Sequence, residues 1–311
     1  SFATLSVVDL LVDDDLTVVG DLDVDGTSNL DIIDVDGAAN FAADVTIATG
    51  ADLLTASAGT DNVRIGLDAG DSIADGGIRN ILIGRNAGTA ITTGDSNIAI
   101  GWEALKTEDA NGNNVAIGAS ALATQNAGAD AYNVAVGYNS GLSVTTGTKN
   151  TIIGSSAGDA LTDADFNTSV GFGSLGFDQL GSKTTAIGYR ALGTQRFTTA
   201  ADSFNTAVGY DAGLEVTTGQ FNTLIGGISG DALTTGAQNV AIGYAALTTD
   251  DLGSHSVAVG PSALFSQNFA TATVSNNTAV GSAAGGAVTT GIQNTLIGGL
   301  AGDALTVGFS N

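Results

Sequence analysis

The chain has no cysteine and no methionine, a single proline, and aromatic residues at only 5% of its 311 positions. The absence of cysteine excludes disulfide bonds and thiolate metal sites. Hydrophobic residues still form 43% of the sequence, which is enough to support an ordered fold rather than a disordered chain. With so few aromatic rings, we expect a thin, regular core built from Ala, Val, Ile and Leu.

Positive charge is also scarce, because 8 Lys and Arg residues stand against 32 Asp and Glu residues, for a net charge of −24. Nucleic acids and anionic membrane surfaces both attract basic proteins, so we expect neither as a partner. The apolar runs are far shorter than a membrane span, and we expect no membrane insertion. We also see no signal-peptide pattern at the start of the sequence.

Glycine, by contrast, occurs 45 times and marks an internal repeat. Short units that resemble Asn-x-Ala-Ile-Gly follow one another fourteen times, mostly 17 residues apart, with longer gaps of 18, 19, 21 and 21. Such a period predicts a solenoid, in which each unit forms one coil. The glycines that close the units are Gly66, Gly84, Gly101, Gly118, Gly137, Gly154, Gly171, Gly188, Gly209, Gly226, Gly243, Gly260, Gly281 and Gly298.

Equivalent positions in successive coils, here called columns, show the local structure. The residue before the closing Gly is Ile or Val in all fourteen units, and two residues earlier stands Val, Ile or Thr. β-branched residues at alternate positions followed by Gly predict a short strand and a tight turn. Parallel stacking at about 4.8 Å per coil gives a rod about 70 Å long. The Asn that opens most units is expected to hydrogen-bond to its copies through amide side chains.

A higher order appears four residues after the closing Gly, where two coils with Gly alternate with two coils with Leu. Four coils therefore form a super-repeat of 71–72 residues. We place the solenoid at 62–311, with super-repeats at 62–132, 133–204 and 205–276 and a partial one at 277–311.

Both faces of the predicted strand are apolar. We assign the Ile and Val column before the Gly, which includes Ile225, to the interior of the coil, and the Ala and Leu column to the outside. An apolar stripe along fourteen coils is not tolerated on a monomer. We therefore expect parallel self-association along the whole rod, as a homotrimer, although a dimer is compatible with the pattern.

The N-terminal part has a different pattern. Residues 16–61 form a predicted β-repeat shaft with regularly spaced glycines, and residues 1–15 a predicted attachment segment for other virion or surface-filament proteins. The stretch "DLDVDG" places Asp21, Asp23 and Asp25 as in the first half of a calcium-binding loop. The twelfth position of that loop is Ile32 rather than Glu, which favours a solvated strand face over a Ca²⁺ site.

The fourth coil of each super-repeat is longer and carries aromatic residues. Excursions from a solenoid lie on its surface, where binding usually occurs. Two interpretations stay open: contact with a receptor or partner, and packing over a neighbouring chain of the trimer. The candidate contact residues are Gln125, Tyr132, Gln195, Phe197, Phe204, Gln267 and Phe269.

Nothing in the sequence predicts an enzyme. His255 is the only histidine, and a chain that repeats its polar residues offers no unique catalytic set. Glycine-rich stretches such as "GGISG" lack the Lys-Ser/Thr pair of a phosphate-binding loop. We expect no catalytic residue, no metal and no cofactor.

The units "NTAVGYDAG" and "NVAIGYAAL" resemble the head repeats of trimeric autotransporter adhesins. This resemblance implies a trimeric left-handed parallel β-roll, although the units here are longer than is usual in that family. "LTVVGDLDVDG" is similar to shaft repeats of bacteriophage tail-fibre and appendage proteins.

Together the two resemblances imply a non-enzymatic fibre of a virion, with a host-surface glycan or protein as receptor. The alternative is a bacterial cell-surface adhesin or filament subunit. Ice binding fits less well, because the Thr residues are adjacent or single rather than in Thr-x-Thr pairs.

Overall fold

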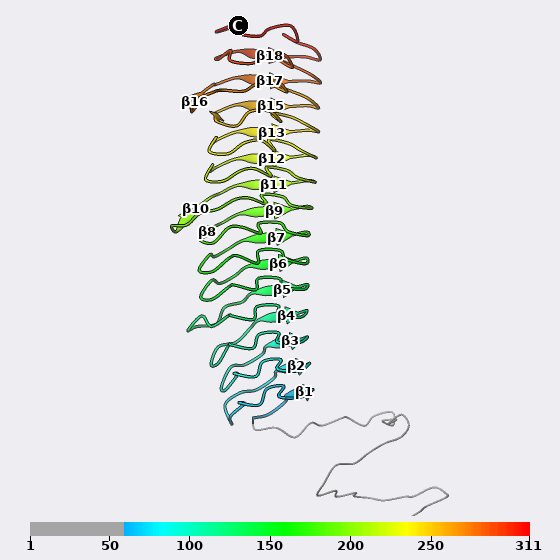
Figure 1. Cartoon of the computed structure of the whole chain (residues 1–311), viewed down its shortest axis with the longest axis vertical. Coiled ribbons are helices and arrows are strands. Elements are labelled where there is room, and N and C mark those ends of the chain that lie inside the picture. The colour runs from blue at the N-terminus through cyan, green and yellow to red at the C-terminus, as the bar shows by residue number, and fades with distance from the viewer. Residues whose placement is uncertain (1–58) are drawn as a thin grey trace, which may run out of the picture. The chain divides into compact units, whose positions relative to one another are not determined.

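The computed structural model describes residues 59–311, which lie within one compact unit, Leu54–Asn311. These residues wind into a column of coils in which fourteen short strands stack as one parallel sheet (Figure 1). No helix occurs in residues 59–311. The prediction of an all-β parallel solenoid with about 17 residues per coil is confirmed. The attachment segment, nearly all of the shaft and the possible Ca²⁺ loop lie outside the described residues.

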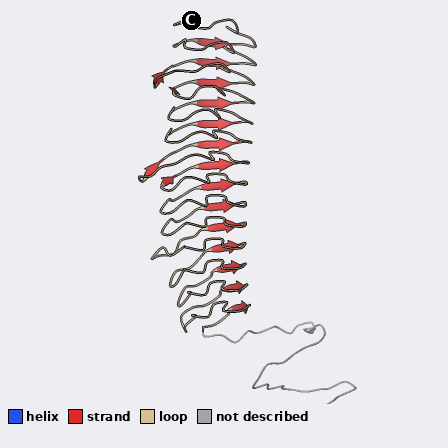
Figure 2. Ribbon diagram, viewed as in Figure 1, coloured by secondary structure: helices blue, strands red, loops and turns tan. Residues whose placement is uncertain are grey.

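Each coil contributes one three-residue strand to the large sheet (Figure 2). In order across the sheet the strands are β1 (Val63–Ile65), β2 (Ile81–Ile83), β3 (Ile98–Ile100), β4 (Val115–Ile117), β5 (Val134–Val136), β6 (Thr151–Ile153), β7 (Thr168–Val170), β9 (Thr185–Ile187), β11 (Thr206–Val208), β12 (Thr223–Ile225), β13 (Val240–Ile242), β15 (Val257–Val259), β17 (Thr278–Val280) and β18 (Thr295–Ile297). Two smaller parallel pairs each join a longer coil to the coil before it: β8 (Gly181–Ser182) pairs with β10 (Ala201–Asp202), and β14 (Gly253–Ser254) pairs with β16 (Thr273–Val274).

The strands are in register, so each column stands directly on its own copies. Leu224 in β12 lies between Ala207 in β11 and Ala241 in β13, and all three are fully buried. Ile225 is 37% exposed. The assignment of the Ile and Val column to the interior was therefore wrong, and the Ala and Leu column is the one inside. A three-residue strand turns only its middle side chain inward, and that position is most often Ala or Leu.

Two further columns complete the interior. Where the first column holds Gly, the second holds an aliphatic residue, and where the first holds Leu, the second holds a polar residue. In the coil of β11, Gly213 leaves room for the buried Val216, and a Cβ on Gly213 would lie 2.6 Å from Cδ1 of Leu224. In the coil of β13, Leu247 fills that room, and the residue three positions later is the buried Asp250. Since a packed interior leaves no spare volume, only one of the two positions can carry an aliphatic side chain. The polar residues that follow an inward Leu are Glu108, Gln125, Asp178, Gln195, Asp250 and Gln267.

The Asn column ties each coil to the next through the backbone. Oδ1 of Asn222 accepts a hydrogen bond from the backbone N–H of Asn239 at 2.9 Å, and its Nδ2 donates to the carbonyl oxygen of Gly236 at 2.9 Å. The predicted contacts between amide side chains occur in only a few coils, as between Asn294 and Asn277. Each Asn therefore satisfies buried backbone groups, a contribution of about 1 kcal/mol per bond.

The closing glycines adopt φ angles between 123° at Gly66 and 146° at Gly209, a region that residues with a Cβ rarely enter. Close stacking adds a second reason for glycine. A Cβ on Gly226 would lie 2.5 Å from the carbonyl oxygen of Gly243 in the next coil. Any side chain here would separate neighbouring coils, which explains why the column is glycine throughout.

The inside and outside of the coil can be tested with two aspartate substitutions. Leu224→Asp places an unpaired charge in the interior, which costs several kcal/mol. We expect early proteolytic cleavage around 205–243, while coils near Gly84 stay protected because each coil contacts only its neighbours. Thr218→Asp, on an exposed turn, serves as the control and should be cleaved at the wild-type rate. Equal cleavage of the two variants would contradict the assignment.

Candidate functional site

Five of the seven predicted contact residues are buried. Gln125, Gln195 and Gln267 have no exposed surface, Phe197 is 6% exposed and Phe269 is 4% exposed. Their side chains point into the coil and offer no surface to a receptor or a neighbouring chain. The expectation that these five residues form a contact surface is therefore corrected.

Gln195 supplies hydrogen bonds at a coil where the Asn column is interrupted. Its coil opens with Thr184, whose short side chain cannot span the coil as Asn does. Nε2 of Gln195 instead donates to Oγ1 of Thr184 at 3.2 Å and to Oδ2 of Asp178 at 2.7 Å, while its Oε1 accepts from Nδ2 of Asn205 at 2.8 Å. The glutamine thus links its own coil to the coil before it and to the coil after it, and has a structural role.

The same network recurs one super-repeat later. Nε2 of Gln267 donates to Oγ of Ser256 at 2.8 Å and to Oδ2 of Asp250 at 2.6 Å, and Nδ2 of Asn277 donates to Oε1 of Gln267 at 2.8 Å. The sequence contains the signal for this role, because the two coils that lack the opening Asn are the ones preceded by a buried Asp.

The two buried phenylalanines, Phe197 and Phe269, hold the longer coils in place. The backbone N–H of Phe197 donates to Oδ1 of Asp178 at 2.9 Å, and its carbonyl oxygen accepts from Leu180 at 3.0 Å. The ring lies so close to Gly181 that a Cβ there would come within 2.8 Å of it. These contacts hold the β8–β10 excursion against the solenoid.

Tyr132 and Phe204 are the two predicted contact residues that lie on the surface, with 53% and 47% exposure. Both stand just before the opening Asn of a coil, in the left-handed region, with φ of 54° and 49°. Phe204 stacks on Phe221 with ring centroids 5.5 Å apart, and the Lys183 ammonium lies 5.2 Å from the Phe204 centroid. These rings remain accessible for contacts with a partner.

The outer face of the fourteen-stranded sheet is an accessible apolar surface. Every outward strand position is Val, Ile or Thr, and none carries a charge, although the chain as a whole has a net charge of −24. Ile153, Ile187 and Ile225 are each 37–38% exposed on this face. An uncharged, β-branched strip of this length differs from the surface of a soluble monomer.

A column of exposed aromatic residues runs beside this face, directly after the closing glycines. Tyr189 stacks between Phe172 and Tyr210, with centroid distances of 5.6 and 5.2 Å. Trp102, Tyr138 and Tyr244 occupy the same column in other coils and are also exposed. The aromatic column widens the apolar surface at one edge of the sheet.

Within residues 59–311, no cluster of His, Cys, Asp and Glu side chains is arranged to hold a metal ion. His255 is exposed on a turn, with φ of 62°. No helix in the described part of the chain is long and apolar enough to span a membrane.

Three buried acids follow the inward leucines. Burial raises the pKa of Asp178 and of Asp250, and hydrogen bonds from Gln195 and Gln267 oppose that rise. Burial likewise raises the pKa of Glu108. Oε1 of Glu108 accepts hydrogen bonds from the backbone and side chain of Asn111, but its buried Oε2 has no partner within the described residues. Glu108 is therefore the least satisfied of the three acids.

Glu108→Gln should stabilise the solenoid at neutral pH. A raised pKa in the fold means that protonation stabilises it, so ionised Glu108 lowers stability above that pKa and the penalty disappears as the pH falls. We expect a gain of about 1 kcal/mol near pH 8 that vanishes near pH 4. Thermal unfolding followed by circular dichroism across this range measures it. The control Asp75→Asn, at an exposed acid, should show no such gain, and a pH-independent gain for Glu108→Gln would refute the explanation.

Comparison of this chain with protein-family models, with curated proteins and with solved structures found no match. The resemblance to adhesin heads and phage fibres therefore rests on the repeat motifs alone.

Proposed function

We propose that this chain forms a homotrimeric, non-enzymatic fibre of a virion, a bacteriophage tail fibre that contributes to host attachment. The observation that carries the proposal is the uncharged outer sheet face, where fourteen strands expose only Val, Ile and Thr. A surface of this kind is stable when it is covered along its whole length. Another copy of the same rod has the length and the coil spacing to cover it.

The outer face that would mediate self-association is formed by the β-branched columns and not by the Ala and Leu column. The Ala and Leu column is buried inside each chain. The β-branched columns lie outside and remain for contact between chains. In parallel packing around a three-fold axis, each sheet face turns toward the axis and the neighbouring aromatic column approaches the next chain. Like coils then meet at the same level, which the uniform sheet face permits at every coil.

The virion assignment is supported by the resemblance of the N-terminal shaft to phage appendage repeats. The extended shape of the solenoid suits a spacer between an attachment point and a surface. The alternative is a bacterial cell-surface adhesin or filament subunit, which would use the same rod. Neither function requires catalysis, a metal or a cofactor.

Trimer formation can be tested by placing charge on the outer sheet face. We expect wild-type protein to have the mass of three chains by native mass spectrometry, and the triple variant Ile153→Asp, Ile187→Asp and Ile225→Asp to dissociate into folded monomers. These side chains lie outside the coil, so the far-ultraviolet circular dichroism should be retained.

The matched control adds the same three charges to exposed turns, as Thr218→Asp, Thr235→Asp and Thr290→Asp, and should remain trimeric. A stable wild-type monomer would overturn the assembly, and a wild-type dimer would overturn its stoichiometry.

The location of the fibre can be decided by immunogold electron microscopy with an antibody against residues 59–311. Labelling of virion tails supports the phage assignment. Labelling of bacterial envelopes without virions supports the adhesin alternative.

A further inference from the structure

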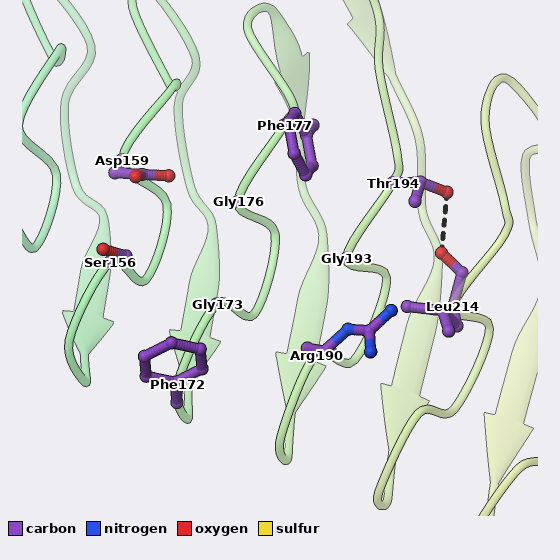
Figure 3. Close-up of a pocket in the computed structure, with 10 residues that line it drawn as sticks. All are labelled: Ser156, Asp159, Phe172, Gly173, Gly176, Phe177, Arg190, Gly193, Thr194 and Leu214. Carbon is purple, nitrogen blue, oxygen red and sulfur yellow. Dashed lines mark hydrogen bonds between the residues drawn. The ribbon is translucent and has the colours of Figure 1, made fainter.

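A hollow interrupts the surface of the solenoid beside β6, β7, β9 and β11. Its volume is about 290 Å³, which approaches the size of small-molecule sites. Figure 3 shows Asp159 on one side and Thr194 on the other, with Phe177 and Arg190 between them and Phe172 near the strand end. The hollow lies outside the coil interior and outside the uniform sheet face.

The hollow exists because glycines replace side chains that other super-repeats carry. Gly173 and Gly176 stand where the first super-repeat has Glu103 and Lys106, whose side chains form an ion pair. A Cβ on Gly173 would meet only one neighbouring atom, Cγ of Arg190 at 3.7 Å. The space is therefore not required by the packing of the coil.

The third super-repeat shows what a filled version looks like. There Thr248 occupies the position of Gly176, and its hydroxyl donates to Oδ1 of Asp231. Asp159 is the equivalent of Asp231, and its Oδ1 would lie 3.5 Å from a Cβ on Gly176. In the coil of Asp159, the carboxylate therefore faces a cavity instead of a threonine hydroxyl.

The lining combines apolar rings with hydrogen-bonding groups of both kinds. Phe172 and Phe177 are 54% and 64% exposed, which leaves ring surface for the C–H faces of a sugar. Asp159 supplies acceptors and Arg190 supplies donors for hydroxyl groups. The Arg190 guanidinium lies 3.9 Å from Asp211, so its charge is partly compensated. This balance, in a chain with a net charge of −24, disfavours an anionic ligand.

A second hollow of about 370 Å³ adjoins the first and shares Phe177 and Thr194 with it. Arg196 and Thr217 complete its lining. Because they share Phe177 and Thr194, the two hollows form one groove along the coils. Because Oγ1 of Thr194 donates to the carbonyl oxygen of Leu214 at 2.7 Å, its lone pairs can still accept a hydrogen bond.

We propose that this groove, defined by Asp159, Phe172, Phe177, Arg190, Thr194 and Arg196, binds a short neutral saccharide. The proposal deepens the proposed function and rests on it, since it assigns the receptor contact to one place on the fibre. It places that contact partly on a longer coil, through Arg190, Thr194 and Arg196, whereas the Gln195 and Phe197 side chains of the same coil are buried.

The test fills the groove with the residue that the chain itself uses elsewhere. Gly176→Thr reproduces the arrangement of Thr248 and should close the first hollow without disturbing the coil. Gly286→Thr is the matched control, because Gly286 occupies the same column away from the groove and meets a similar backbone neighbour at 3.2 Å. Phe177→Ala removes an exposed ring and tests the aromatic contribution independently.

Binding is measured on an array of neutral and acidic bacterial mono- to tetrasaccharides and quantified by calorimetry for any saccharide retained. We expect wild type and Gly286→Thr to bind the same neutral saccharides, and Gly176→Thr and Phe177→Ala to bind at least tenfold more weakly. Native mass spectrometry of each variant accompanies the binding measurement.

Three results would overturn the proposal: no neutral saccharide bound by wild type, equal binding by all variants, or binding of acidic saccharides alone. A changed oligomeric state in Gly176→Thr would also overturn it, because the groove would then be covered by another copy. The trimer mass and the immunogold location are measured separately, so a failed groove leaves the fibre proposal standing.

Discussion

In-register stacking is the constraint on which the rest of this structure depends. Each residue stands on its equivalent in the next coil, so a change in size or polarity is felt at once by two neighbours. The closing glycine column is the strictest case, since a Cβ on Gly226 would meet the backbone of the next coil at 2.5 Å. A weaker form of the same constraint applies to the inward Leu position and the position three residues later. The coil interior has a fixed volume, so a large aliphatic side chain fits at only one of the two.

Buried polar groups follow from that constraint. Once Leu175 occupies the interior, the position of Asp178 no longer has room for an aliphatic side chain and becomes polar. A buried carboxylate needs hydrogen-bond donors, and Gln195 in the next coil supplies one at 2.7 Å. The same glutamine also hydrogen-bonds to Thr184, which stands where most coils have Asn. Hydrogen bonds therefore link the buried acid, the glutamine and the Thr that replaces Asn. The same combination occurs again at Asp250, Gln267 and Ser256.

The coil length, the strand positions and the parallel stacking could be predicted from the sequence because repetition exposes them directly. The orientation of the strand could not, since a period of two defines two faces without saying which one is inside. The three-residue strand turns its middle side chain inward, so Ala207 and Leu224 are buried and Ile225 lies outside. Gln195 and Phe197 were misplaced for a related reason, because a polar or aromatic residue in a longer coil suggests a surface loop until its partners in adjacent coils are known.

Uniform and irregular surfaces of this solenoid differ in what they can encode. The outer sheet face repeats the same β-branched columns at every coil, so it can bind a like surface but cannot mark a unique position. Recognition of a particular ligand requires asymmetry, and a repeat protein gains it only where one copy departs from the others. Gly173 and Gly176 are such a departure, because the filled versions at Glu103 and Lys106, and at Ala245 and Thr248, show that the coil does not need the space. The uniform sheet face and the hollow therefore obey different rules of substitution, and Phe172 lies where the aromatic column beside that face meets the hollow.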